Sequence, residues 1–207
     1  MTETRGEQKE RTRRTILDTA LELSQDGGLS ALSLRQVAKT VGIVPTAFYR
    51  HFESLDELGL VLVEESFESL RAMLRDVRQG EPVPREIIRR SVEALTAHVA
   101  ANQGQFAFIA RERSSGPRPV REAVRHQLEL VERELATDLA LITAGRWSGD
   151  DLNTLANLMV TAMVRTAEDL VNAETKAAHA DIKNRAERQL RMVVVGALHW
   201  RSDYRDD

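Results

Sequence analysis

The sequence of 207 residues contains no cysteine, which excludes a disulfide framework, a thiolate zinc site and a cysteine nucleophile. Aromatic residues are scarce, at 4%, and none of the five prolines interrupts a long periodic segment. No apolar run approaches the ~20 residues of a membrane-spanning helix, and the N-terminus has no hydrophobic signal core. We therefore expect a cytoplasmic protein that has no contact with a membrane.

Residues that favour helices dominate the chain. Hydrophobic residues make up 42% of the sequence, enough for a packed core, and apolar positions recur at helical spacing. The clearest break is the segment 79–84, which contains Gly80, Pro82 and Pro84. We expect an all-α protein of about nine helices, over residues 8–25, 33–41, 45–52, 54–78, 85–101, 105–113, 120–143, 150–171 and 176–200.

The segment 33–52 is the most informative part of the sequence. Ser33 followed by Gln36 is a capping-box pattern, which predicts the start of a helix. Gly42 permits the tight turn that ends this helix. Pro45 suits the first turn of a second helix, because its missing N–H costs nothing there. The segment therefore predicts two short helices joined by a glycine turn.

The second of these helices has one buried face and one free face. Phe48 and Phe52, four residues apart, are predicted to be buried. The free face carries hydroxyl, aromatic and cationic groups, which is typical of the recognition helix of a helix-turn-helix. The alternative is an ordinary helical hairpin of an α-helical core. The residues assigned to the free face are Thr46, Ala47, Tyr49, Arg50 and His51.

The net charge of −3 is unusual for a protein that binds DNA, but the charges are unevenly distributed. The run from Lys9 to Arg14 places four cations near the start of the first helix, among them Arg13 and Arg14. Such an arm beside a helix-turn-helix can contact phosphates. The alternative is a solvated helix end, although cations there oppose the helix dipole.

The sequence does not favour an enzyme. None of its five histidines has a glutamate three residues earlier, which excludes the Glu-x-x-His pairs of di-iron carboxylate proteins. His-Glu-x-x-His, phosphate-binding glycine loops and Gly-x-Ser-x-Gly are also missing. We expect no metal and no cofactor. A helical adaptor that binds hydrophobic ligands or proteins without binding DNA stays open as an alternative.

The run GIVPTAFYRHF over residues 42–52, followed by ESLDEL over residues 53–58, resembles the signature of the TetR family of bacterial transcriptional regulators. The resemblance implies a helix-turn-helix DNA-binding domain over residues 1–54 and a ligand-binding and dimerisation domain over 55–207. It implies a homodimeric regulator, by family precedent a repressor, on a palindromic double-stranded DNA operator. The residues expected to contact DNA are Arg13, Arg14, Ser33, Arg35, Val44, Pro45, Thr46, Ala47, Tyr49, Arg50, His51 and Leu55.

The last two long helices carry wide apolar faces, and these fit either an intramolecular core or a contact with a second copy. In the TetR family the last two helices of each chain form a four-helix dimer interface. The resemblance therefore implies a dimer interface at Leu155, Met159, Leu190, Val194 and Ala197.

A set of apolar and aromatic residues after residue 94 could line a ligand cavity, although such residues also suit an ordinary core. The segment 106–114, FAFIARERS, and the run 30–60 resemble the FabR and DesT repressors of unsaturated fatty-acid synthesis. This resemblance implies a long-chain acyl-CoA as effector, with Arg111 and Arg113 near its phosphates. Another apolar molecule, as in the control of drug efflux, is the alternative. The candidate ligand residues are Leu95, Val99, Phe106, Phe108, Ile109, Arg111, Arg113, Val124, Leu128, Met159 and Met163.

Overall fold

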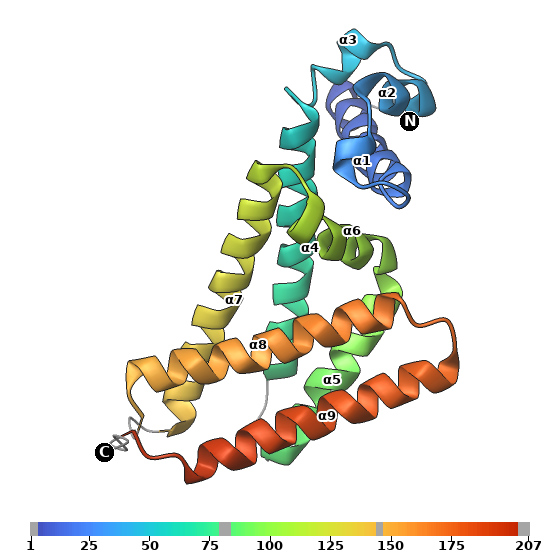
Figure 1. Ribbon diagram of the computed structural model, residues 1–207. Helices are drawn as coiled ribbons and strands as arrows, with labels where there is room; N and C mark the ends of the chain where they lie inside the picture. The colour runs from blue at the N-terminus through green and yellow to red at the C-terminus, as the bar shows by residue number, and fades with distance from the viewer. Residues whose placement is uncertain (1–3, 79–83, 144–146, 203–207) are drawn as a thin grey trace. The chain divides into compact units, whose positions relative to one another are not determined.

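The computed structural model describes residues 4–78, 84–143 and 147–202, and these form nine α-helices, one 3-10 turn and no strand (Figure 1). The expected all-α class is therefore confirmed. Most of the expected break at 79–84 lies outside the described residues. The elements are α1 (Arg5–Leu23), η1 (Leu29–Ala31), α2 (Leu34–Val41), α3 (Pro45–Phe48), α4 (Leu55–Arg78), α5 (Pro84–Ala101), α6 (Gln103–Ser115), α7 (Arg118–Thr143), α8 (Gly149–Val171) and α9 (Lys176–His199).

The described residues fall into two compact units that interleave along the chain. Unit 1 contains the described residues of Met1–Glu68 together with Gln103–Arg125, and unit 2 contains those of Ser69–Asn102 and His126–Asp207. Helix α6 therefore groups with the N-terminal helices, although it lies in the C-terminal half of the sequence. The functional division at residue 54, expected from the sequence, is a different partition and stays a prediction.

Unit 1 is built on α1, whose capping begins the helix earlier than the expected residue 8. Thr4 accepts a hydrogen bond from the backbone N–H of Glu7, and the Glu7 side chain accepts one from the N–H of Thr4. This capping box adds residues 5–7 to the helix. The apolar face of α1 packs against α2, and the buried side chains of the two helices are Ile16, Leu17, Ala20, Val37 and Ala38.

Unit 2 contains three helices that pack side by side, together with the last part of α4 and most of α7. Helices α8 and α9 run antiparallel, and α5 packs against both (Figure 1). Hydroxyl side chains cap both C-terminal helices: Ser148 accepts from the N–H of Asp151, and Thr175 accepts from the N–H of Ala178. Between α5 and α9 lies a buried cluster of Ile88, Val92, Ala186 and Leu190.

Candidate DNA-binding interface

The turn between α2 and α3 is a Schellman motif centred on Gly42. Gly42 adopts φ +80°, in the left-handed region, and its N–H bonds to the carbonyl of Lys39. The N–H of Ile43 bonds to the carbonyl of Ala38 at 2.9 Å. These two bonds satisfy carbonyls that the end of α2 would otherwise leave unpaired. The expected glycine turn is therefore present, and it sets the direction in which α3 begins.

Helix α3 is shorter than expected. It covers Pro45–Phe48 rather than residues 45–52, and residues 49–51 form a turn instead. Phe48 and Phe52 are nonetheless fully buried as expected, with ring centroids 5.8 Å apart. The ring of Tyr49 meets Phe48 edge-on at 6.1 Å. These aromatic contacts anchor one side of the short helix in the core of unit 1.

The opposite side of α3 is open to solvent. Val44 is 64% exposed and Tyr49 is 58% exposed. Ala47 and His51 are only half-buried, and Arg35, in the first turn of α2, is exposed as well. The exposed surface of unit 1 at α3 and the start of α2 therefore carries a hydroxyl group, an aromatic ring and two guanidinium groups. The exposed residues of α3 and its flanks are Val44, Pro45, Thr46, Tyr49 and Arg50.

Two of the residues assigned to DNA contact begin helices. The hydroxyl of Ser33 accepts from the N–H of Gln36 at 3.2 Å, which confirms Ser33 as the N-cap of α2. Leu55 is half-buried at the start of α4, directly after Ser54, whose hydroxyl accepts from the N–H of Glu57 at 3.0 Å. That either residue meets DNA stays a prediction.

The two arginines of the basic arm make different intramolecular contacts. Arg13 donates from Nη1 to the carbonyl of His51 at 2.9 Å, and its guanidinium carbon lies 4.3 Å from the ring centroid of Phe52. Arg14 forms ion pairs at 2.6 Å with Asp18 and with Glu65. The bonds from Arg13 to His51 and from Arg14 to Glu65 are not visible in the sequence, because the partners lie 38 and 51 positions away, whereas Asp18 is only four positions from Arg14.

The surroundings of His51 favour the neutral form of its imidazole. Burial lowers the pKa of His51 below its usual value, and the nearby cations Lys9, Arg13 and Arg50 lower it further. Its Nδ1 atom is buried without a hydrogen-bond partner. The lowered pKa makes a positive charge on His51 less favourable, so the candidate interface relies on arginines and lysines for its positive charge.

Helix α6 binds the main chain that connects α1 to η1. Arg111 donates to the carbonyl of Gln25 at 2.7 Å and to that of Asp26 at 3.2 Å. Glu112, 1% exposed, accepts from the N–H of Leu29 at 2.8 Å. A Cβ atom on Gly28 would lie 2.7 Å from Glu112 Oε1. This docking of α6 was not expected from the sequence, since its partners lie 83 to 86 residues away.

These contacts bear on the expected ligand site. The guanidinium of Arg111 donates to two backbone carbonyls, and its expected contact with CoA phosphates stays a prediction. Arg113 is exposed on α6, and its contact with CoA phosphates stays a prediction. The candidate ligand residues are also divided between the units. Leu95, Val99, Leu128, Met159 and Met163 belong to unit 2, and Phe106, Phe108, Ile109, Arg111, Arg113 and Val124 belong to unit 1.

The expected dimer residues differ in their burial within unit 2, and their contact with a second copy stays a prediction. Leu155 and Leu190 are buried within unit 2 itself. Met159 and Val194 pack against the cluster of α5 and α9. Both faces of α9 carry apolar residues, so the helical spacing alone does not decide which face meets a second copy. The exposed apolar residues of the two helices and the residue that follows them are Leu158, Met192, Val195, Leu198 and Trp200.

Comparison with known proteins agrees with the geometry of unit 1. Residues 16–60 match the family described as bacterial regulatory proteins, tetR family, and residues 84–196 match the tetracyclin repressor-like C-terminal domain. The second match alone covers more than half of the chain. The chain belongs to the TetR family. Members of this family are transcriptional regulators rather than enzymes; they bind DNA operators, dimerise and respond to small molecules.

Solved structures share the TetR fold with this chain. A transcriptional regulator from Rhodococcus sp. Rha1 has a TM-score of 0.70 at 20% identity, over 89% of this chain and 96% of its own. GusR of Salmonella enterica has a TM-score of 0.68 at 19% identity, over 87% and 96%. A TetR-family regulator from Syntrophomonas wolfei reaches 0.76 at 14% identity, over 92% and 98%. At such identities the likeness concerns the fold alone. Among the described residues, no helix combines the length and apolarity needed to cross a membrane.

Proposed function

We propose that this TetR-family regulator represses genes of fatty-acid or lipid metabolism, and that a long-chain acyl-CoA alters its affinity for a palindromic operator. The observation that carries the DNA-binding part is the α2–α3 pair, in which a Schellman turn presents a short helix whose outer side carries Thr46, Tyr49 and Arg50. Such a protein works where chromosomal DNA lies, so we also propose a cytoplasmic location.

The shortness of α3 supports a two-fold operator. A helix of four residues can reach only a few base edges, and Arg35 of α2 adds one more candidate contact. Sequence-specific binding then requires a second copy on a second half-site, about one DNA turn or a multiple away. Two equivalent readers related by a two-fold axis favour a palindromic sequence.

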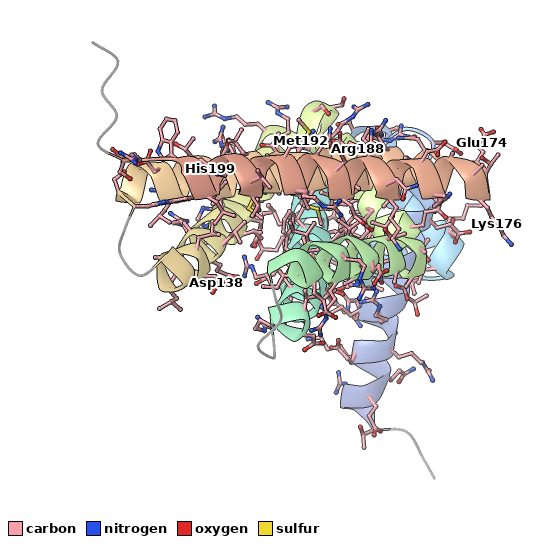
Figure 2. All side chains as sticks on the ribbon, turned by 90° about the horizontal axis from the view of Figure 1, so that it is seen from below. Asp138, Glu174, Lys176, Arg188, Met192 and His199 are labelled. Atoms are coloured by element: carbon pink, nitrogen blue, oxygen red, sulfur yellow. The ribbon has the colours of Figure 1, made fainter. Side chains whose placement is uncertain are left out.

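The outer faces of α8 and α9 are the proposed dimer surface, in place of the inner residues expected from the sequence. Met192 is 70% exposed and Leu198 is 72% exposed, and both lie on the last helix. Figure 2 shows Arg188 and Met192 on the side of α9 that points away from α5. Apolar side chains gathered on an exposed face mark a protein contact. A second copy that presents the same face would cover them, together with Leu158 and Val195.

The acyl-CoA part of the proposal is supported by the resemblance of residues 30–60 and 106–114 to the FabR and DesT repressors. Within unit 2, Leu95 and Val99 are buried, and Leu128, Met159 and Met163 are half-buried. Thioether side chains adapt to ligands of different shape, so this group is the candidate for contact with an acyl chain. An effector acts only through a difference in its affinity for the two states of the regulator.

Operator affinity measured with and without acyl-CoA tests this proposal. The probe is the duplex most strongly enriched by the protein from a random library, and the additions are oleoyl-CoA, palmitoyl-CoA and free CoA as control. We expect at least one thioester to change the affinity by a factor of about 5 to 150 relative to free CoA. If neither thioester does so, the acyl-CoA assignment is wrong, and a screen of other apolar molecules follows.

A further inference from the structure

Helix α3 of unit 1 is too short for its own helical hydrogen bonds to hold it, so its orientation depends on contacts with neighbouring elements. Helix α3 contains four residues, and isolated helices of that length are unstable in water because nucleation is costly. Its end carries no glycine or asparagine in the left-handed conformation; Tyr49 there has φ −63° and ψ −8°. The turn that follows relies on local bonds, such as that from the N–H of His51 to the carbonyl of Phe48 at 2.8 Å.

A contact from α1 adds to the anchoring by the turn at Gly42 and by the buried ring of Phe48. The guanidinium of Arg13 lies over the ring of Phe52, 4.3 Å from the centroid, and donates to the carbonyl of His51 at 2.9 Å. The ring of Phe52 is itself fixed, since it is 1% exposed and packs against Phe48. One flat group therefore binds the two residues that close the turn after Tyr49. Any rotation of this turn would break both contacts together.

We infer that Arg13 is a positioning residue of the DNA-binding interface, which orients the exposed residues of α3 through the planar shape of its guanidinium rather than by neutralising a phosphate. Lysine carries the same charge, but its ammonium has no flat face and no fixed fork of donors, so it cannot reproduce the paired stacking and hydrogen bond. If the planar shape of Arg13 matters, Arg13→Lys should disturb the residues of α3. If only the positive charge matters, Arg13→Lys should behave as the wild type does. The consequence for DNA rests on the proposed function, whereas the positioning itself can be measured without DNA.

The first experiment uses the full-length protein alone and follows backbone hydrogen exchange. In Arg13→Lys we expect the amides of His51 and Phe52 to exchange about tenfold faster, while those of α1 and α2 keep their protection. Arg14→Lys is the matched control, because Arg14 lies beside Arg13 and pairs with Asp18 and Glu65 instead. Unchanged exchange at residues 51 and 52 in Arg13→Lys would overturn the inference.

The second experiment compares the selected operator duplex with a scrambled duplex of equal length, between 50 and 200 mM KCl. We expect Arg13→Lys to lower the ratio of specific to non-specific affinity by about tenfold, because misplaced base contacts are lost. Its salt dependence on the scrambled duplex should equal that of the wild type, and Arg89→Lys, at an exposed position of α5 in unit 2 outside the candidate interface, should keep the ratio.

A phosphate contact gives the opposite pattern. Arg13→Lys would then keep the affinity ratio, while Arg13→Gln would reduce the slope of log affinity against log salt by about 0.9, the value of one phosphate contact. That pattern would overturn the inference. If the wild type selects no duplex, the proposed function fails, and the exchange experiment still decides the role of Arg13.

Discussion

Arg35 and Tyr49 are the side chains on which the proposed reading of the DNA sequence depends most directly. Both are exposed in unit 1, one in the first turn of α2 and the other at the end of α3. If Arg35 reads a base edge with two hydrogen bonds, Arg35→Ala should weaken operator binding by ~1–3 kcal/mol. Tyr49→Ala should weaken it through loss of a phosphate or apolar base contact. Fluorescence anisotropy with a labelled operator duplex measures both.

The control for these two variants is Arg89→Ala, which removes an exposed guanidinium from α5 in unit 2. It should leave operator binding unchanged. Full operator affinity in both Arg35→Ala and Tyr49→Ala, with helix content intact by circular dichroism, would show that the α2–α3 pair does not read DNA.

Glu112 makes stability depend on pH. Burial raises the pKa of Glu112 above its usual value of 4.5, and the hydrogen bond from Leu29 and the charge of Arg111 oppose this only in part. The folded state therefore favours the protonated form. As pH rises from 4.5 through the raised pKa, the unfolded chain ionises first, so the contribution of Glu112 to the free energy of unfolding falls.

Glu112→Gln removes this titration while keeping an oxygen that can accept from Leu29. We therefore expect the free energy of unfolding of Glu112→Gln minus that of the wild type, both measured in urea, to be larger at pH 8 than at pH 4.5. Glu112→Ala should cost ~1–3 kcal/mol, because it leaves the buried N–H of Leu29 without an acceptor. A difference between Glu112→Gln and wild type that is independent of pH would contradict this explanation.

At the scale of elements, the turn after α2 depends on one backbone conformation. Gly42 lies at φ +80°, and a Cβ there would meet no atom within 4 Å. Any cost of Gly42→Ala is thus conformational rather than steric, and we expect a loss of ~1–2 kcal/mol in the free energy of unfolding. Gly149→Ala, at the open start of α8, is the matched control and should be neutral or slightly stabilising. Equal stability of the two variants would contradict the role of Gly42.

The elements that could be predicted are those specified by neighbouring residues. Ser33, Gly42 and Pro45 each determine the backbone conformation of residues close to them along the chain. The α2–α3 pair is therefore predictable from the sequence alone. The early end of α3 is not predictable from local pattern, and the turn after it contacts Arg13, which lies 38 residues from His51. The same holds for Glu112, whose partner Leu29 lies 83 residues earlier, and which reads in the sequence as an ordinary surface acid.

The choice between two apolar faces of one helix also lies beyond local pattern. Leu190 and Met192 are both apolar and only two positions apart, yet Leu190 is buried against α5 and Met192 is exposed. The sequence shows that α9 is apolar on much of its circumference. Only the packing of α5 and α8 decides which part is left for a second copy.

At the scale of the whole molecule, this difference predicts the behaviour of two charge substitutions. Met192→Glu should give a folded monomer, because a charge in a dry interface between copies costs several kcal/mol. Leu190→Glu should instead lower the thermal stability of the chain itself, since the charge enters its own core. Sedimentation equilibrium and circular dichroism separate the two results. A Met192→Glu protein that stays dimeric at micromolar concentration would rule out the outer face of α9 as the interface.

Selection of duplexes from a random DNA library by the purified wild-type protein, with Arg35→Ala in parallel, tests the DNA-binding function most directly. We predict that the wild type enriches one palindromic sequence, with half-sites whose centres lie about 10 base pairs or a multiple apart, as two α3 helices related by a two-fold axis require. Arg35→Ala should lose this enrichment at one position of each half-site. Recovery of no common sequence by the wild type, or of the same sequence by both proteins, would contradict sequence reading by α2 and α3.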